Sequence, residues 1–411
     1  MKRVLLLSTT TGYQARMFRD AAERVEIPLA LASDRCHVLE DPWRDGAIPV
    51  RFEKPEESAR TIVQFAKGNP IQGLVAIGDP PTVTAALAAR ALGLDYHPPE
   101  AVEACRNKCL ARERYRAAGL PAPWYKTFPA AGQHPVDEVL YPCVLKPLGL
   151  SGSRGVIRAD NPEEFQAAFR RIRSLLRAPD VRRMRDEAAE WIQVESYIPG
   201  CEVAVEGILT RGRLRVLAVF DKPDPLEGPY FEETIYVTPS RLNVDAIVEA
   251  VERAVAAVGL WHGPLHAELR LNPQGVWMLE MAARPIGGLC ARALHFGDGM
   301  PLEELILRHA LGEPVENLPR EDAASGVMMI PIPKAGVLES VENVKQAEAT
   351  PGVEQVEITV KLGQELVPLP EGASYLGFIF ARGETREFVE QALRQAHQAL
   401  RFVISVSLPV V

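Results

Sequence analysis

The segment VLKPLGLSGSRGV, residues 144–156, joins a short apolar run to a lysine and then to a stretch rich in glycine and serine. Small residues let several backbone N–H groups approach one anion, and Lys146 adds a full positive charge. The segment is not a P-loop, because the lysine precedes the glycines and no GK[ST] follows them. Taken alone, it fits either a flexible surface loop or a phosphate-binding loop.

Composition limits the classes of protein that this chain can belong to. The chain has 411 residues, 47% of them hydrophobic, and a net charge of −8. This length predicts about two to four lobes. The acidic balance argues against nucleic acid as the main partner, and no apolar run approaches the ~20 residues of a membrane span. The six cysteines include no CxxC pair, which favours reduced thiols in a cytoplasmic protein.

The order of predicted elements indicates an α/β protein. The first hundred residues alternate strands and helices, which predicts a parallel sheet covered by helices. The continuously apolar strand at 4–7 fits burial on both faces of that sheet. Asn161, Pro162 and Glu164 predict a capped helix start, and strands are predicted near 202–210, 213–220, 264–271 and 275–281. A last lobe from about 323 combines short strands with a helix at 385–400.

The segment LHAELRLNPQGVWMLEMAARP, residues 265–285, predicts a β-hairpin. Asn272 and Pro273 suit a type I turn, and Gly275 can close a three-residue loop. Such a loop pairs residue 272 with residue 276, and therefore places Glu268 directly opposite Glu280.

Like charges in a direct cross-strand pair are destabilising. A pair that keeps both carboxylates therefore favours a cation between them, and Mg²⁺ is the natural candidate because it accepts carboxylate and phosphate oxygens. The alternatives are a slipped register with one solvated glutamate, or pairing of both glutamates with arginines such as Arg270 and Arg284.

The segment VESYIPGCEVAVEG, residues 194–207, predicts two strands joined by a Pro-Gly turn. A short hinge can offer backbone groups to an adenine edge, and Glu202 can accept hydrogen bonds from ribose hydroxyls. An interdomain connector with solvated acids is the alternative.

Taken in order, these motifs resemble the ATP-grasp superfamily of carboxylate–amine ligases, most closely its L-amino-acid ligase (dipeptide synthetase) branch. The resemblance implies an α/β chain with α+β character in its nucleotide lobes, in which two lobes clamp ATP. It further implies a Rossmann-like N-terminal domain at 1–97, an ATP-grasp domain at 98–322 with a mobile lid at about 126–197, and a C-terminal α+β domain at 323–411.

The resemblance also implies the functional residues. Lys108 and Lys146 would contact the nucleotide phosphates under a mobile glycine loop, Glu195 and Ile198 would hold adenine, and Glu202 would hold ribose. The implied nucleotide-binding set is Lys108, Lys146, Ser151, Gly152, Ser153, Glu195, Tyr197, Ile198 and Glu202. The implied metal ligands are Glu268 and Glu280, and the implied catalytic residues are Arg284, Glu233 and His266.

Three of these residues have further interpretations. Arg284 would lie near the reacting phosphoryl group. Glu233 and His266 are the two candidates for the base that deprotonates an amine. His266 also fits a supporting role beside a metal carboxylate, which is common for a histidine on a strand.

The chain departs from the superfamily pattern at two positions. Many members read E-x-N-P-R at the second metal site, whereas this chain has alanine at 282. Alanine cannot coordinate a metal, although E-x-A/G-A-R occurs in the dipeptide-ligase branch. The segment FEETIYVTPS, residues 231–240, resembles a branch motif, but Tyr236 stands where some members have histidine.

The resemblance implies an ATP-dependent ligase that forms an amide bond through an acylphosphate and releases ADP and phosphate. The implied cofactors are ATP and Mg²⁺, with Mn²⁺ as an alternative metal. The implied partners are a small-molecule carboxylate and an amine, in particular amino acids, in a cytoplasmic homodimer that binds neither nucleic acid nor membrane. Another ATP-grasp chemistry (a carboxylase or a purine-synthesis ligase) and a non-catalytic nucleotide-binding regulator stay open as alternatives.

Overall fold

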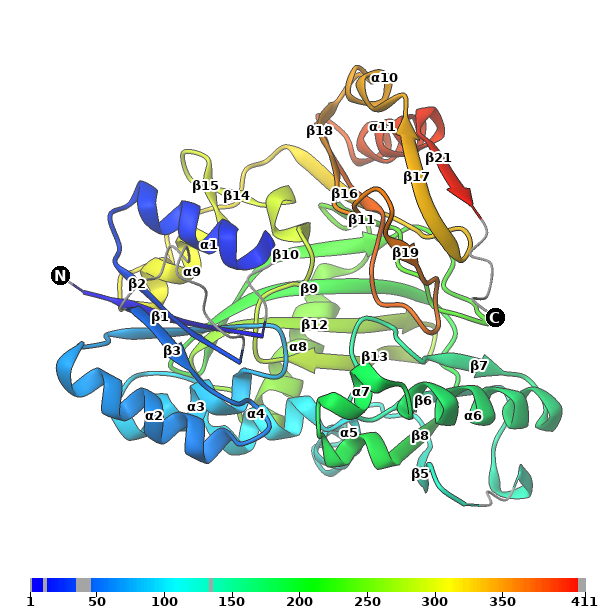
Figure 1. The fold of residues 1–411 in the computed structure, drawn as a ribbon, viewed down its shortest axis with the longest axis horizontal. Helices are drawn as coiled ribbons and strands as arrows, with labels where there is room; N and C mark the ends of the chain where they lie inside the picture. The colour runs from blue at the N-terminus through cyan, green and yellow to red at the C-terminus, as the bar shows by residue number, and fades with distance from the viewer. Residues whose placement is uncertain (1, 10–12, 35–45, 133–135, 406–411) are drawn as a thin grey trace.

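An eight-stranded sheet forms the centre of this computed structural model, which describes residues 2–9, 13–34, 46–132 and 136–405 (Figure 1). Its strand order is β13-β12-β9-β10-β11-β16-β20-β18, and all neighbouring strands are antiparallel. The strands are β9 (Cys201–Thr210), β10 (Arg213–Lys222), β11 (Ile235–Thr238), β12 (Gly263–Asn272), β13 (Gly275–Ala282), β16 (Ala324–Ile330), β18 (Val353–Ile358) and β20 (Gly377–Gly383).

The two faces of the central sheet differ in character because side chains alternate along each strand. On β9 and β12, Val203, Leu265 and Leu269 are fully buried in a core that includes helix α8 (Val244–Val258). The intervening residues, among them Glu202 and Glu268, therefore point to the opposite face. That polar face is where the candidate site is built.

The N-terminal lobe, residues 2–97, confirms the predicted parallel sheet. Its strands are β1 (Val4–Ser8), predicted at 4–7, with β2 (Leu29–Ser33), the short β3 (Ala47–Pro49) and β4 (Gly73–Ile77). Helices α1 (Tyr13–Arg24), α2 (Pro55–Gly68) and α3 (Thr82–Leu92) cover the sheet. Leu5 and Leu7 join one core cluster and Val4 and Leu6 another, so β1 is buried on both faces as predicted.

A smaller lobe, residues 125–196, follows helices α4 (Pro99–Arg106) and α5 (Lys108–Ala117). Its sheet has the order β5-β8-β6-β7, from β5 (Tyr125–Pro129), β6 (Cys143–Pro147), β7 (Ile157–Ala159) and β8 (Trp191–Ser196). Helix α6 (Pro162–Leu176) packs on this sheet, and α7 (Pro179–Arg183) follows it. Asn161 accepts a hydrogen bond from the Glu164 backbone N–H at 3.0 Å, which confirms the predicted cap.

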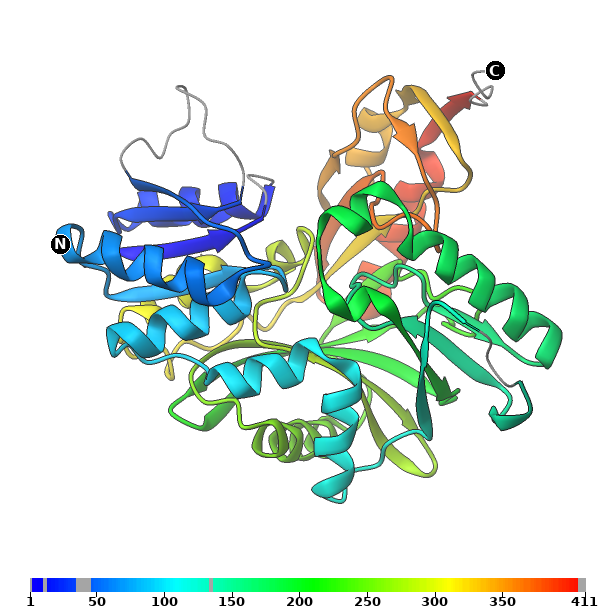
Figure 2. The same ribbon diagram turned by 60° about the horizontal axis from the view of Figure 1, so that its bottom comes forward.

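The C-terminal lobe, residues 324–405, continues the central sheet through β16, β20 and β18. A second sheet of order β19-β17-β21 and two helices complete it: β17 (Gly336–Glu342), β19 (Glu365–Leu366), β21 (Arg401–Ser405), α10 (Val344–Glu348) and α11 (Arg386–Ala399). Figure 2 shows this lobe beside the small lobe. The central sheet contains strands from both sides of residue 323. The predicted domain limits 1–97, 98–322 and 323–411 therefore remain a proposal.

None of the described helices has the length and apolar character that crossing a lipid bilayer requires.

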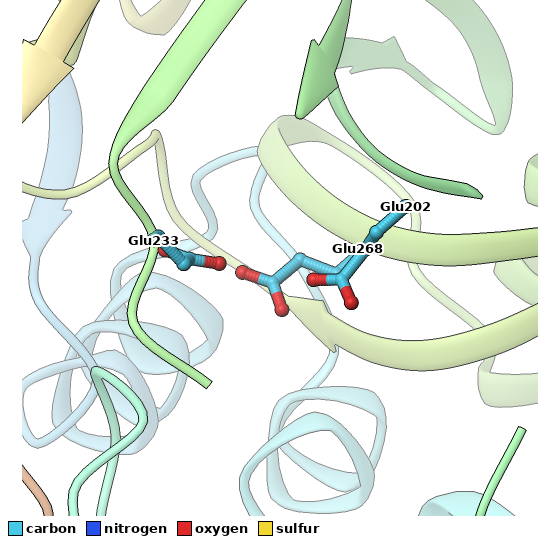
Figure 3. Close-up of side chains that lie close together, drawn as sticks. All are labelled: Glu202, Glu233 and Glu268. Atoms are coloured by element: carbon cyan, nitrogen blue, oxygen red, sulfur yellow. The ribbon is translucent and has the colours of Figure 1, made fainter. Parts of the chain in front are cut away.

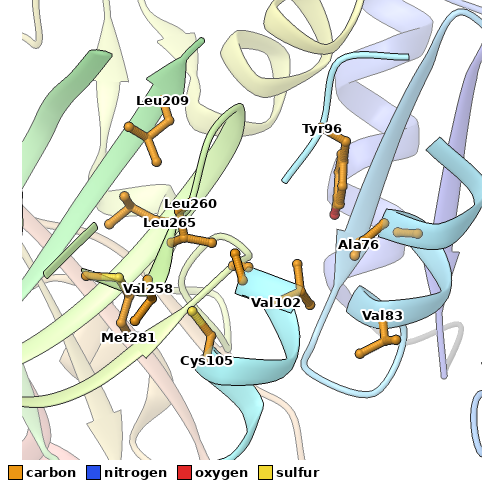
Figure 4. Packing of buried hydrophobic residues seen from close by; sticks show 14 of the residues in the cluster. Ala76, Val83, Tyr96, Val102, Cys105, Leu209, Val258, Leu260, Leu265 and Met281 are labelled. Carbon is orange, nitrogen blue, oxygen red and sulfur yellow. The ribbon is translucent and has the colours of Figure 1, made fainter. Parts of the chain in front are cut away.

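The N-terminal lobe shares its core with the central sheet. Figure 4 shows Ala76 and Val83 of the N-terminal lobe, Val102 of α4, and Leu265 and Met281 of the central sheet within one apolar cluster. Burial of this shared apolar surface fixes the N-terminal lobe against the edge of the sheet that carries β12 and β13.

Three buried histidines lie where these parts meet: His97 before α4, His262 before β12, and His309 on α9 (Leu302–Ala310). The rings of His262 and His309 stack at 4.2 Å. His97 accepts the Trp261 backbone N–H at Nδ1 (3.2 Å) and lies 3.0 Å from the Pro264 carbonyl at Nε2, so the neutral ring satisfies both contacts. Burial lowers the pKa of His97 to about 4 and that of His309 to about 3.

We predict that this histidine cluster makes the protein less stable in mild acid. A histidine in the unfolded chain has a pKa near 6.5. Below that pH the unfolded chain takes up a proton that the folded protein, with its neutral His97, does not, so acid favours unfolding. The free energy of unfolding should fall by about 2 kcal/mol between pH 7 and pH 5 through His97 alone. In urea titrations, His97→Gln, which keeps a donor and an acceptor, should flatten this pH dependence; an unchanged slope would contradict the prediction.

Candidate functional site

One cavity of about 300 Å³ lies between the small lobe, the polar face of the central sheet and the C-terminal lobe. Each site residue predicted from the sequence lines it. They are Lys108, Lys146, Ser151, Gly152, Ser153, Glu195, Tyr197, Ile198, Glu202, Glu233, His266, Glu268, Glu280 and Arg284. Their convergence is a geometric finding, and the chemical role of each residue remains a proposal.

Where charged residues pair directly across β9, β10 and β12 on the polar face, their charges are opposite. Glu202 on β9 lies opposite Lys222 on β10 and opposite Arg270 on β12. Its two carboxylate oxygens accept hydrogen bonds from these cations at 2.7 and 2.8 Å. Farther along, Glu206 on β9 lies opposite His266 on β12, and the two side chains are hydrogen bonded. Such pairs stabilise neighbouring strands.

Glu268 and Glu280 form an exception to this pattern, because they are two acids in direct register. The structure confirms their pairing, but the predicted three-residue turn is wrong. Asn272 pairs with Gly275, so the turn has two residues rather than three. An irregularity between Glu268 and Leu269 then leaves Leu279 as an extra residue in β13 and restores the Glu268–Glu280 pair.

The arginines offered as an alternative explanation for this pair are engaged elsewhere. Arg270 binds Glu202, and Arg284 binds Asp79. Glu280 lies 3.8 Å from the Lys108 ammonium, and Glu268 lies 3.6 Å from that of Lys222. Neither glutamate is therefore neutralised by the predicted arginine.

Three carboxylates gather at the centre of the cavity wall. Figure 3 shows Glu202, Glu233 and Glu268 directed toward one another, and one oxygen from each lies within 4.8 Å of the others. The Lys222 ammonium, 3% exposed, contacts all three. Carboxylate oxygens are the ligands that Mg²⁺ prefers. Lys222 already pairs closely with Glu202 and Glu233, so the opposed Glu268 and Glu280 are the carboxylates that best fit a divalent cation.

The two candidate bases differ in their electrostatic surroundings. Burial raises the pKa of Glu233 to about 7, and the neighbouring Glu268 and Glu202 add to this effect although Lys222 opposes it. Burial alone would lower the pKa of His266, but Glu206 and Glu268 raise it to about 9. An imidazolium has no free lone pair, so Glu233 is better placed than His266 to accept a proton.

The two predicted nucleotide lysines approach the cavity from different elements. Lys108, at the start of α5, donates to the Leu150 carbonyl at 3.0 Å. Lys146, on β6, donates to Glu195 at 2.7 Å. Burial would raise the pKa of Glu195, but Arg112 and Lys146 lower it to about 2. Glu195 is therefore a buried anion that holds Lys146 at the cavity wall.

The hinge and the glycine loop adopt defined conformations. The Ile198 carbonyl accepts a hydrogen bond from Arg270 at 2.7 Å, and Tyr197 stacks on Phe231 with the ring centroids 6.4 Å apart. In the glycine loop, Gly152 and Ser153 both have positive φ angles, 66° and 56°. Ser153 thus adopts a backbone conformation that is uncommon for a non-glycine residue.

The N-terminal lobe supplies a partner for the predicted catalytic arginine. Arg284 donates to both oxygens of Asp79, at 3.0 and 3.1 Å, from Nε and one terminal nitrogen. Burial would raise the pKa of Asp79, but Arg284 lowers it. Asp79 follows β4 at the carboxyl end of a parallel strand, a common place for binding residues.

Two further segments contribute to the cavity wall. Gly287 and Gly288 line it and lead into a four-residue 3₁₀ helix, Cys290–Ala293. The C-terminal lobe contributes Ala373, Ser374 and Tyr375.

Four charged residues at the site were not predicted from the sequence: Asp79, Arg112, Glu206 and Lys222. Glu206 had a usable signal, since it shares a strand face with Glu202. Arg112 follows Lys108 by one helical turn. Lys222 ends an apolar strand and Asp79 follows one, but their partners are remote in sequence.

Three segments of the chain match models of known domain families. Residues 19–95 match an ATP-grasp N-terminal domain, residues 139–293 an ATP-grasp domain, and residues 328–405 an L-amino acid ligase C-terminal domain. The crystal structure of L-amino acid ligase from Bacillus licheniformis superposes with a TM-score of 0.82 at 25% identity, covering 98% of this chain and 99% of that one.

Relatives found by sequence have similar identities. The uncharacterized protein y4rH of Sinorhizobium fredii is 24% identical over 98% of this chain and 84% of its own length. Alanine–anticapsin ligase of Bacillus subtilis is 28% identical over 62% of this chain, and the match spans only 57% of that ligase. The predicted fold class and the resemblance to L-amino-acid ligases are confirmed.

We predict that Lys146→Ala weakens ATP binding at least about tenfold, because it removes a cation from the cavity wall. Isothermal titration calorimetry with a nonhydrolysable ATP analogue measures the change. Lys126→Ala is the matched control, since Lys126 lies in the same lobe on β5 with its side chain 43% exposed and paired with Glu138. Equal affinities for the wild type and Lys146→Ala would contradict the assignment.

We predict that Asp79→Asn lowers turnover about tenfold or more while leaving nucleotide affinity unchanged. The substitution removes the carboxylate that orients Arg284 by accepting two hydrogen bonds from it. Steady-state phosphate release and calorimetry separate the two effects. Asp95→Asn is the control, since Asp95 makes an exposed ion pair with Arg211 at 2.8 Å. A loss of nucleotide affinity equal to the loss of turnover would argue against this role.

Proposed function

We propose that this chain, an ATP-grasp ligase by its fold and its domains, joins a carboxylic acid to an amine through an acylphosphate. One observation carries the proposal: Lys108, Lys146 and Arg284 face the same cavity as the opposed Glu268 and Glu280. This arrangement suits a polyanionic nucleotide together with a metal ion. The matches to an ATP-grasp domain and to an L-amino acid ligase C-terminal domain support this reaction class.

The chemistry explains why the site needs these charges. A free carboxylate is a poor acyl donor, so its attack on the γ-phosphate of ATP first converts it to an acylphosphate and releases ADP. The amine then attacks the acyl carbon and expels phosphate. Protein groups contribute mainly by positioning the reactants and by neutralising negative charge.

Each cation has a proposed part in this sequence. Lys108 and Lys146 bind the nucleotide phosphates, and the glycine loop at 149–155 covers them with Ser151, Gly152 and Ser153. Glu195, Tyr197 and Ile198 form the adenine end of the site. Arg284, held by Asp79, faces the reacting phosphoryl group.

Glu268 and Glu280 are the proposed ligands for Mg²⁺, or for Mn²⁺ in its place, and a bound ion would offset charge on the phosphates. Both carboxylate oxygens of Glu202 already bind cations, Lys222 and Arg270. Ribose hydroxyls would therefore share a carboxylate that also organises the sheet.

We propose amino acids as the substrates, in line with the C-terminal domain match. Glu233 belongs to the carboxylate cluster and accepts a hydrogen bond from Tyr236 at 2.9 Å. We propose Glu233 as the base that accepts a proton from the amine. The described cysteines are all free thiols, which supports the expected cytoplasmic location. The expected homodimer stays a prediction.

We predict that release of ADP and phosphate requires both an acid and an amine. A panel of amino-acid pairs, each tested with either partner omitted, would identify the substrates by phosphate release, and mass spectrometry would identify the amide. Tight ATP binding without turnover across the panel would instead favour a non-catalytic regulator.

We further predict that Glu280→Gln lowers phosphate release by about 100-fold or more, because it removes a charged metal ligand while keeping the shape of the side chain. Glu303→Gln is a control, since Glu303 is a buried glutamate on α9 outside the cavity. Near-wild-type turnover of Glu280→Gln would refute its assignment as a metal ligand.

A further inference from the structure

The extra residue in β13 decides what faces the cavity. Neighbouring residues in a regular strand point to opposite faces of the sheet. Leu279 and Glu280 nevertheless both line the cavity, because the irregularity at this point sets both of them against Glu268. A bulge of this kind re-aims side chains and also leaves a backbone group without its ladder partner.

A buried arginine takes up the carbonyl group at this bulge. Arg112 on α5 donates to the Leu279 carbonyl oxygen at 2.7 Å, and its side chain is 1% exposed. The arginine is fully inside the protein, where each of its hydrogen bonds is shielded from water. Its reach to Leu279 therefore ties the helix that carries Lys108 to the strand position next to Glu280.

The same guanidinium holds the anion behind the second lysine. Arg112 donates from Nε to one oxygen of Glu195 at 2.8 Å and from a terminal nitrogen to the other at 3.2 Å. Glu195 in turn accepts from Lys146 at 2.7 Å. This buried chain of charges runs from α5 through β8 to β6.

We infer that Arg112 is a positioning residue for the nucleotide and the metal. One rigid planar group joins three supports: α5, which begins with Lys108; Glu195, which holds Lys146; and the bulge, which aims Glu280. The inference rests on the proposed function of these three residues as nucleotide and metal contacts. Arg112 itself does not line the cavity.

Lysine cannot replace arginine in this role. Its ammonium is a point charge on a flexible stem, whereas the guanidinium presents donors in a fixed fork that serves Glu195 and the carbonyl together. Arg112→Lys thus keeps the buried positive charge but loses the geometry that links the small lobe to the central sheet.

The test compares ligand binding by the folded protein. Calorimetry gives the affinity for ADP, and electron paramagnetic resonance gives the affinity for Mn²⁺ in the presence of ADP. We expect Arg112→Lys to weaken both at least about tenfold, because Lys146 and Glu280 lose a common support. Arg114→Lys is the matched control: Arg114 lies on the same helix and donates to the carbonyls of Val258 and Glu100, away from the cavity.

A second variant covers the case in which Arg112→Lys does not fold. Arg112→Met combined with Glu195→Gln removes both buried charges, and replacing a buried pair in this way is often tolerated. This double variant should fold and still bind Mn²⁺ in the presence of ADP at least about tenfold more weakly than Glu195→Gln alone, because the Leu279 carbonyl loses its donor.

The outcomes distinguish the inference from the proposed function. Two results would overturn the inference: Arg112→Lys binding like the wild type, or the double variant binding like Glu195→Gln alone. An equal loss in Arg114→Lys would also overturn it. If Lys146→Ala and Glu280→Gln also bind ADP and Mn²⁺ like the wild type, the proposed site itself is wrong. The inference is supported when each Arg112 variant binds more weakly than its own reference protein while Arg114→Lys binds like the wild type.

Discussion

Two glutamates in direct register, Glu268 and Glu280, impose the constraint on which the site depends. Elsewhere on the polar face of the central sheet, the acids of β9 lie opposite cations of β10 and β12. A like-charge pair in that setting is unfavourable unless cations lie nearby. Lys108 and Lys222 supply charge from outside the pair, at 3.8 and 3.6 Å. This uncompensated pair supports the proposal that a divalent cation binds beside Glu268 and Glu280.

Every site residue predicted from the sequence lines the cavity, but most of the contacts that hold these residues in place were not predicted. Alternation along β12 puts His266, Glu268 and Arg270 on one face, and that period is visible in the residues themselves. The Glu268–Glu280 pair was reached through a three-residue turn, whereas the chain uses a two-residue turn and a bulge. The two differences cancel because each shifts the register by one residue. Bulges carry no reliable sequence signal, since they depend on a distant donor such as Arg112.

The same reasoning applies to the fold. The parallel strands of the N-terminal lobe and the capped start of α6 follow from local patterns, and the structure contains both. The continuous sheet from β13 to β18 could not be foreseen, because β11 (Ile235–Thr238) pairs with β16 (Ala324–Ile330) and 85 residues of chain lie between them. Asp79 was missed for a related reason: its partner Arg284 is distant in sequence, and only folding brings them together.

Hydrogen bonds join the C-terminal lobe to the glycine loop of the site. The Gly155 backbone N–H donates to the Pro370 carbonyl at 2.8 Å, and Arg154 donates to the Glu371 carbonyl at 2.7 Å. The glycine loop is therefore fastened to the segment that supplies Ala373 and Tyr375 to the cavity wall. Under the proposed function, an opening of the small lobe to admit a nucleotide would break these two hydrogen bonds, and closing would restore them. The proposed nucleotide binding would then be coupled, through this short stretch of chain, to the position of the C-terminal wall of the cavity.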